Sequence, residues 1–254
     1  MDKRAIFDHY SRILDNLIEN NVAFRFYFQD PFSWDESFLM PFNPNWVLNC
    51  GATRVCIEDE TYDYVIKIDL ANWDSCEEEV GIYEAAREAN LSQYFTEVEY
   101  IGTYCKTYQF YDMQEIELEL GFEYYNFEER FYKIVDNCGE LHDITIELPL
   151  YAYRRAIPHN YNAVYNELGE AKESDNEIIA RSSKSPLTER NLAVGIEFIK
   201  QYGVDEFLRL SDFLEDNYVN DLHCGNFGDI DNRIVCIDYA GYHNPDYSDY
   251  EEEY

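Results

Sequence analysis

Two short segments near the C-terminus place three polar side chains at fixed spacings. The first reads Asn-Asp-Leu-His-Cys-Gly-Asn over residues 220–226, and the second reads Ile-Asp-Tyr-Ala-Gly over residues 237–241. Asn226 follows Asp221 by five residues, and Asp238 follows Asn226 by twelve. The neighbouring segments are apolar and read as buried, so the sequence predicts that these three groups are held between buried elements on either side of a short β-hairpin, 227–238.

Length and composition allow one large domain or two small lobes that share a core. The chain has 254 residues, and its hydrophobic fraction of 46% argues against wholesale disorder. Its seven cysteines form no C-x-x-C pair, which argues against a zinc site or a disulfide framework and favours a reducing cytosol. The N-terminal residues lead into a polar helical pattern, so a cytoplasmic protein without a signal peptide or membrane span is expected.

The net charge of −33 comes from 52 acidic and 19 basic residues. This charge disfavours nucleic acid or an anionic membrane as a direct ligand, because both would be repelled. Two interpretations stay open: a solvated acidic surface, or a surface that binds a basic protein partner and imitates the charge of nucleic acid.

The predicted elements follow an α+β order, with strands and one helix first, then helices, then the hairpin. Apolar residues at helical spacing predict a helix at the N-terminus, from Ile6 to Leu17. A second helix is expected over 74–90, and helices again from about 188 onward. Strands are expected at 46–49, 54–58, 64–70, 97–111, 130–136 and 143–150.

Three regions are expected along the chain. An N-terminal helix and connector occupy 1–45, a β-rich part occupies 46–150, and a helical part with the polar loop and the hairpin occupies 151–254. Residues 112–129 contain seven acids and no base, and read as an acidic insertion. The polar segment 166–186 reads as a loop.

The spacing of Asp221 and Asn226 resembles the kinase catalytic loop H-R-D-x-x-x-x-N, with Asp238 in the place of the D-F-G aspartate. The chain thus resembles a compact, divergent member of the protein-kinase-like superfamily, similar to bacterial and phage kinase-like proteins and to small-molecule phosphotransferases. The resemblance implies a two-lobed fold with a minimal C-terminal lobe. It also implies that Asp221 is the catalytic base and that Asn226 and Asp238 bind Mg²⁺, whose preferred ligands are oxygens.

Several positions depart from the family pattern. Val219 and Asn220 stand where kinases have the His and Arg of the catalytic loop. His223 stands where kinases often carry a lysine that touches the transferred phosphate. Tyr239 replaces the Phe of D-F-G, and the glycine is displaced to Gly241. These departures bear on catalytic activity more than on the fold.

Residues 65–68, Val-Ile-Lys-Ile, resemble the kinase V-A-I-K strand, which implies that Lys67 contacts nucleotide phosphates. A lysine in an apolar strand needs a partner, because burying an unpaired ammonium costs several kcal/mol. Glu79 is the expected partner, with Glu84 the second candidate. Snorkelling at a strand edge is the structural alternative for Lys67. Glu79 is preferred because an apolar stripe follows it at helical spacing, Ile82, Tyr83 and Ala86.

Two further nucleotide contacts are implied by the resemblance. Gly51 lies in a small-residue turn where kinases place the Gly-rich loop over the phosphates, and an ordinary hairpin turn is the alternative. Arg54 follows this turn, and its side chain either approaches phosphate or faces solvent. Residues 148–153 are the candidate hinge for adenine.

Only sixteen residues follow Asp238, which leaves no room for an activation segment, an A-P-E motif and the helices that hold a peptide. The sequence therefore predicts a phosphotransferase that uses Mg-ATP on an acceptor of unknown identity, a small molecule or a protein. The alternatives are an acidic pseudokinase-fold protein of phage type that binds or inhibits a basic partner, and a nucleotide sensor without turnover.

Overall fold

The computed structural model describes residues 1–20, 45–50, 54–69, 74–110, 141–158, 192–219, 222 and 224–240. It confirms the α+β class, with helices and a five-stranded antiparallel sheet. The chain forms two compact units: Met1–Asp74 with Glu99–Tyr153, and Ser75–Val98 with Arg154–Tyr254. These bounds differ from the three predicted regions, because the N-terminal helix groups with the sheet and the helix after residue 74 groups with the C-terminal part.

The five strands of unit 1 confirm five of the six predicted strands, and the sixth, 130–136, lies outside the described residues. β-branched residues dominate the centre of the sheet, as expected for strands that pack on one face. The spatial order is β1-β2-β3-β5-β4, and Ile57 of β2 stands opposite Leu48 of β1 and Ile66 of β3. The strands are β1 (Trp46–Cys50), β2 (Arg54–Asp59), β3 (Tyr64–Asp69), β4 (Val98–Phe110) and β5 (His142–Arg154).

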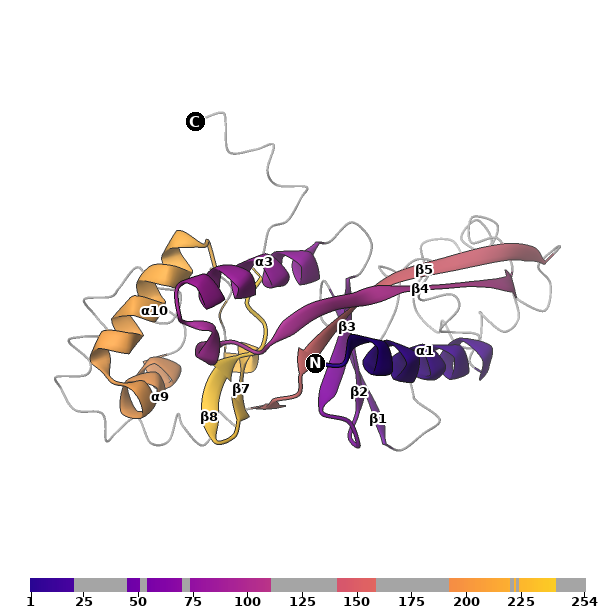
Figure 1. Ribbon diagram of the computed structural model, residues 1–254. Helices are drawn as coiled ribbons and strands as arrows, with labels where there is room; N and C mark the ends of the chain where they lie inside the picture. Colours follow the sequence, from indigo (N-terminus) through magenta and orange to yellow (C-terminus); the bar gives the residue numbers. More distant parts are fainter. Residues whose placement is uncertain are drawn as a thin grey trace, which may run out of the picture. The chain divides into compact units, whose positions relative to one another are not determined.

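Helix α1 (Lys3–Asn20) supplies the other half of the core of unit 1 (Figure 1). Its apolar residues recur at helical spacing, which confirms the predicted amphipathic helix. Buried residues of α1 and of the sheet form one cluster that includes Ile6, Tyr10, Leu14, Val55, Ile57, Ile66, Ile68, Leu148 and Leu150. The core of unit 1 therefore lies between α1 and one face of the sheet.

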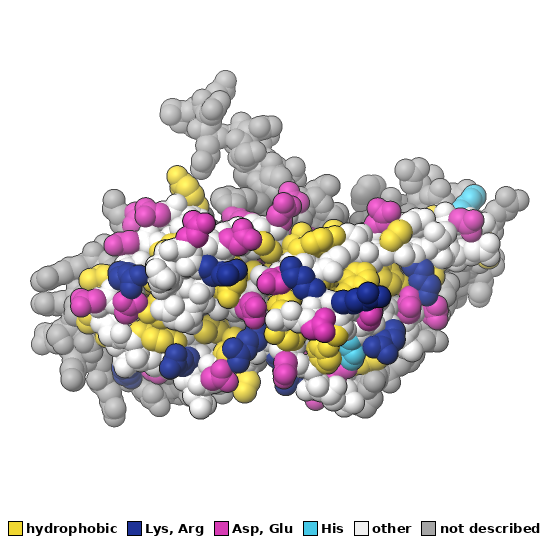
Figure 2. All heavy atoms as spheres, viewed as in Figure 1, with side chains coloured by type: hydrophobic (Ala, Val, Ile, Leu, Met, Phe, Trp, Pro, Cys, Tyr) yellow, Lys and Arg dark blue, Asp and Glu magenta, His cyan; other side chains and the backbone are white. Residues whose placement is uncertain are grey.

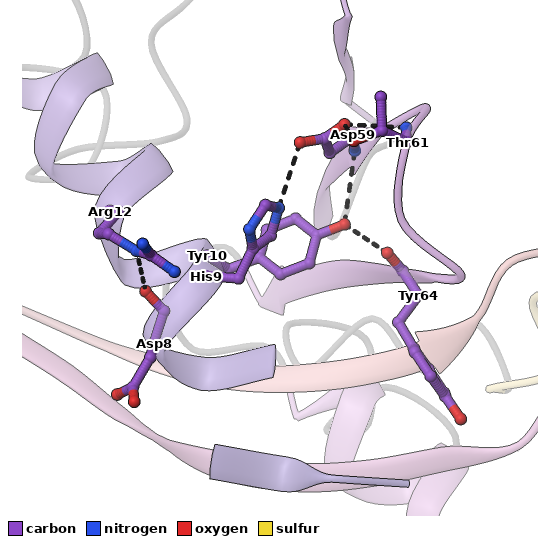
Figure 3. A network of polar contacts seen from close by, with 7 residues as sticks. All are labelled: Asp8, His9, Tyr10, Arg12, Asp59, Thr61 and Tyr64. Atoms are coloured by element: carbon purple, nitrogen blue, oxygen red, sulfur yellow. Dashed lines mark hydrogen bonds and ion pairs between the residues drawn. The ribbon is translucent and has the colours of Figure 1, made fainter. Parts of the chain in front are cut away.

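Polar contacts join α1 to the β2–β3 hairpin at the edge of this core (Figure 3). His9 Nε2 lies 3.1 Å from Asp59 Oδ2, and the His9 ring stacks on Tyr62 with the centroids 4.3 Å apart. The Tyr10 hydroxyl donates to the carbonyl oxygen of Tyr64. Asp59 Oδ1 accepts hydrogen bonds from the backbone N–H and the hydroxyl of Thr61. These contacts fix the helix on the sheet.

Gly102 of strand β4 lies close to helix α1. Gly102 has φ 145°, and a Cβ there would lie 2.9 Å from the ring of Phe7. A glycine is therefore required by both the backbone angle and the close approach of α1.

Unit 2 combines helices with a small sheet of order β6-β7-β8 (Figure 1). The hairpin predicted over 227–238 is confirmed, and its register pairs Phe227 with Cys236. The helices expected after residue 188 are confirmed as α9 (Leu192–Tyr202) and α10 (Val204–Asp216), which contact one another. The remaining elements are α3 (Ser75–Glu88), η3 (Ser92–Tyr94), β6 (Ile157–Pro158), η5 (Cys224–Asn226), β7 (Phe227–Ile230) and β8 (Arg233–Cys236).

Aromatic rings fill the core of unit 2. Tyr94 of η3 packs edge-on against Phe198 and Tyr202 of α9, and Phe95 packs edge-on against Phe213 of α10. Such ring pairs bury large areas in a fixed geometry. Within the helices that the structure describes, none has the length and apolar character needed to cross a bilayer.

Candidate functional site

The structure describes four of the six predicted site residues. Asp221 and Gly51 lie outside the described residues, so the predicted base and the predicted phosphate-covering turn stay predictions. Lys67 belongs to unit 1. The other three, Glu79, Asn226 and Asp238, belong to unit 2.

The β7–β8 hairpin brings the backbone of Asn226 to the residue before Asp238. Beyond the pair Phe227–Cys236 the backbone N–H of Ile237 donates to the carbonyl oxygen of Asn226 at 2.8 Å. Asn226 is 7% exposed, and Asp238 is half-buried. At the open end of the hairpin Asn226 therefore stands opposite Ile237, and Asp238 is the next residue along the chain.

The donor set of this pair suits Mg²⁺. An amide oxygen from Asn226 and a carboxylate from Asp238 are hard oxygen ligands, and Mg²⁺ is usually held by one or two protein ligands while substrate phosphates and water complete the shell. No cluster of three or more His, Cys, Asp or Glu side chains suited to a metal is present among the described residues.

A buried carboxylate holds the segment that follows Asp238. Glu79 on α3 is fully buried, and its Oε1 accepts hydrogen bonds from the backbone N–H of Tyr239 at 2.6 Å and of Ala240 at 3.2 Å. Ile82 and Ala86 on the same face of α3 are also buried, which confirms the predicted apolar stripe. Glu84, the second candidate, is exposed.

The charge of Glu79 affects its neighbours. Burial raises the pKa of the Cys236 thiol, and the Glu79 carboxylate adds to that rise. Burial and then the same carboxylate raise the pKa of the Tyr239 hydroxyl well above its usual value. The Cys236 thiol and the Tyr239 hydroxyl therefore stay neutral at physiological pH. Neither adds a second negative charge beside the Glu79 carboxylate, which remains a hydrogen-bond acceptor.

Three more contacts fix the same segment. The carbonyl oxygen of Cys236 accepts a hydrogen bond from the backbone N–H of Thr96 at 2.8 Å, and Phe95 forms a parallel bridge with Cys236. The Tyr239 hydroxyl donates to the carbonyl oxygen of Thr96 at 2.9 Å. Asp238 thus lies between two residues, Ile237 and Tyr239, whose backbones are both held. No residue pattern indicates the role of Thr96, because Thr96 acts through its backbone.

Lys67 occupies an interior strand of unit 1. Strand β3 lies between β2 and β5 in the described sheet, which argues against the strand-edge alternative. Lys67 Nζ lies 4.4 Å from the centroid of the Tyr153 ring, and Tyr153 is 1% exposed. An ammonium over an aromatic face is attracted by the ring quadrupole. Tyr153 is thus a contact of Lys67 that sequence reasoning missed, and the pairing of Lys67 with Glu79 stays a prediction.

The structure also describes the candidate adenine hinge and Arg54. The candidate hinge, 148–153, lies inside β5, which continues to Arg154. Tyr153 and Arg154 also mark the boundary between the two units. Arg54 is 7% exposed, so its side chain does not face solvent, and the solvent-facing alternative is wrong.

Comparisons with known proteins do not assign a family. No protein-family model matches the chain, and a search of curated proteins finds no match.

Proposed function

We propose that the protein is a kinase-like phosphotransferase that uses Mg-ATP. The observation that carries this proposal is the double hydrogen bond from the backbone after Asp238 to the buried carboxylate of Glu79. A carboxylate whose following backbone is held in this way keeps its side chain in one place, as a metal ligand requires. The backbone of Asn226 is joined to Ile237, the residue before Asp238.

Each predicted residue then has a distinct task. Asn226 and Asp238 hold Mg²⁺, which bridges the nucleotide phosphates, and Asp221 accepts the proton of the attacking hydroxyl. Lys67 contacts the phosphates, with Glu79 as its predicted counterpart. Gly51 lies in the turn proposed to cover the phosphates. The position of Lys67 on the third strand and of Glu79 on the next helix supports this assignment, because kinases use the same two elements.

The acceptor is proposed to be a small molecule or a protein that bears positive charge. With a net charge of −33, the protein repels anions and attracts cations over the distance that screening allows. The same repulsion acts on ATP, so binding of the nucleotide depends on Mg²⁺ and on local cations. This dependence gives the proposal a sharp test.

Calorimetric titration with ATP, with and without Mg²⁺, tests the proposal. We expect the wild-type protein to bind ATP only with Mg²⁺, and Asp238→Asn to weaken this binding by about tenfold or more. Asp231→Asn is the matched control, because Asp231 is an exposed carboxylate in the turn of the same hairpin, 2.9 Å from Arg154. Transfer or release of phosphate, lost in Asp221→Asn, would then establish turnover.

Two results would contradict the proposal: no binding of Mg-ATP by the wild-type protein, or equal binding by Asp238→Asn and the control. Binding without turnover would instead support a nucleotide sensor. Each result is distinct from a failure to fold, which far-UV circular dichroism of the same samples reports.

The second candidate function is an acidic binding protein, favoured by the excess of 52 acidic over 19 basic residues. On the face drawn in Figure 2, however, Lys and Arg side chains are interspersed with Asp and Glu, and no single-sign patch covers the described parts there. Charge mimicry needs one continuous negative surface. Figure 2 therefore gives this candidate no support on that face, and we place it second.

A further inference from the structure

The sheet of unit 1 has a second face, opposite α1, that carries cations. Val55 and Ile57 of β2, with Ile66 and Ile68 of β3, belong to the core beneath α1. Because side chains alternate along a strand, Arg54 and Lys67 lie on the opposite face. The contact between Lys67 and Tyr153 agrees, since Leu150 and Ala152 of β5 belong to the α1 side.

The register of β2 and β3 places these two cations close together. Arg54 pairs with Asp69, and Cys56 pairs with Lys67. Arg54 and Lys67 are therefore diagonal neighbours across one pair of strands, with backbone positions about 7–8 Å apart, which is within reach of two long side chains. One polyphosphate group is large enough to contact both.

The lysines on the α1 side of unit 1 form ion pairs at the surface, unlike the buried Arg54. Lys106 donates to Asp15 and Glu19 of α1, and Lys3 pairs with Glu99. The side chains of Lys106 and Lys3 are 33% and 53% exposed, as is usual for surface ion pairs. Arg54, in contrast, is 7% exposed. A guanidinium removed from water to this degree is costly unless anionic groups surround it.

We propose that Arg54 and Lys67 together bind the polyphosphate of a nucleoside triphosphate. This inference rests on the proposed function and adds Arg54 as a second phosphate ligand. Asp69 supplies one carboxylate beside Arg54, and Glu58 lies four residues further along β2 on the same face. In the register Arg54 stands opposite Asp69, and Lys67 lies two residues before Asp69 on the same face of β3. A polyphosphate bound next to Arg54 and Lys67 would neutralise the repulsion between these two closely spaced cations.

Arginine suits this task because its planar fork binds two phosphate oxygens at once, whereas lysine acts as a point charge. The overall charge of −33 makes such a local pair necessary, since the long-range field of the protein opposes an approaching triphosphate. Burial of Arg54 reduces the screening of its charge, so each phosphate contact is stronger than at the surface. The pair therefore determines the preference for nucleotides with several phosphates.

Calorimetry with ATP and AMP, both in Mg²⁺, tests the proposal. We expect Arg54→Met and Lys67→Met each to weaken ATP binding by about 10- to 100-fold, while AMP binding changes less than about threefold. Lys106→Met is the matched control, because it removes one cation from the other face of the same sheet and is expected to leave ATP binding unchanged. Arg54→Lys keeps the charge without the fork and is expected to recover part of the loss.

Equal ATP binding by Arg54→Met and by Lys106→Met would overturn the proposal and leave Arg54 a structural residue. If Arg54→Met fails to fold, Asp69→Asn replaces it in the test. If Arg54 and Lys67 bind phosphate, removing the negative charge opposite Arg54 should strengthen ATP binding. An unchanged or weaker affinity for ATP would overturn the proposal. Inorganic tripolyphosphate separates this inference from the proposed function. Binding of ATP and tripolyphosphate that needs Arg54, in a protein that neither transfers nor releases phosphate, would sustain this inference while the phosphotransferase proposal fails.

Discussion

Two buried carboxylates, Asp59 in unit 1 and Glu79 in unit 2, show how differently the two units use an acid. Asp59 is 6% exposed and is satisfied mostly by its own turn, through two hydrogen bonds from Thr61, and by His9 on α1. Glu79 is fully buried and accepts backbone hydrogen bonds from residues about 160 positions later in the chain. Asp59 stabilises a hairpin, whereas Glu79 sets the path of a distant segment.

The hydrogen bonds of the two acids indicate which unit is the better candidate for a functional site. A turn aspartate that binds the residue two positions later is a common structural device. A buried glutamate that accepts two backbone N–H groups next to Asp238 joins segments about 160 residues apart, and these hydrogen bonds offset the cost of burying its charge. The comparison therefore favours unit 2 as the place of the proposed metal site.

The largest effect is expected for Glu79→Ala. It leaves the buried N–H groups of Tyr239 and Ala240 without their acceptor, so the free energy of unfolding should fall by about 3 kcal/mol, with a smaller loss for Glu79→Gln. Urea denaturation followed by circular dichroism measures the change. Glu84→Ala is the control, because Glu84 is exposed on the same helix, and it should change stability by less than about 0.5 kcal/mol. Equal stabilities of the two alanine variants would remove the contrast between the two carboxylates.

The second effect concerns the pH dependence of unit 1 through Asp59. Burial favours its neutral form, but the hydrogen bonds from Thr61 and the neighbouring His9 outweigh burial and lower the pKa of Asp59. A carboxyl with a lowered folded-state pKa stabilises the fold above its unfolded value, near ~4, and this stabilisation is lost as the pH falls through the folded value.

Asp59→Asn should therefore cost about 1–2 kcal/mol at pH 7, and stability should fall less steeply below pH ~4 than in the wild-type protein. Melting temperatures between pH 3 and pH 7 measure this. Asp63→Asn removes an exposed carboxylate from the same turn and should keep the acid-dependent loss, because Asp59 is intact. If the stability of Asp59→Asn falls with pH as steeply as that of the wild-type protein, Asp59 does not cause the acid-dependent loss.

The third effect, about 1 kcal/mol, is expected for Tyr239→Phe. This change removes only the hydroxyl that donates to the carbonyl oxygen of Thr96 inside unit 2. Tyr218→Phe is the control, because Tyr218 is 75% exposed, and its loss of a hydroxyl should leave the free energy of unfolding unchanged. If Tyr239→Phe also slows or weakens binding of Mg-ATP, the hydroxyl contributes to the position of Asp238 as well as to stability.

Much of the fold was predictable because its signals are local. The apolar spacing of Ile6, Tyr10 and Leu14 predicted the α1 helix, and the apolar run from Val235 to Ile237 predicted the second strand of the hairpin. The same helical spacing correctly indicated that Glu79, rather than Glu84, is buried. These features depend on residues a few positions apart, where the period of a helix or strand decides which side chains share a face.

The contacts that were missed are distant in the sequence and leave no local pattern. The sequence predicts that Glu79 pairs with Lys67. Nothing in the composition of α3 indicates that the Glu79 carboxylate accepts a hydrogen bond from the backbone of Tyr239. Backbone groups have no sequence signature, since nearly every residue has them. The position of Tyr153 beneath Lys67 depends on how β5 enters the sheet beside β3, which the order of strands along the chain does not state.

The smallest effect is expected for Lys106→Met, which tests whether the surface of unit 1 is held by charge. Lys106 Nζ donates to Asp15 at 2.6 Å and to Glu19 at 2.7 Å, and these bonds outweigh burial and raise the pKa of the lysine. Its side chain is 33% exposed, so water and salt screen the pairs, and the variant should lose about 0.5 kcal/mol at low ionic strength. In 1 M salt the Debye length shrinks to about 3 Å, and the difference from the wild-type protein should largely vanish. A loss as large as that of Glu79→Ala, unaffected by salt, would mean that unit 1 also depends on a buried charge and that the contrast drawn between the two units is wrong.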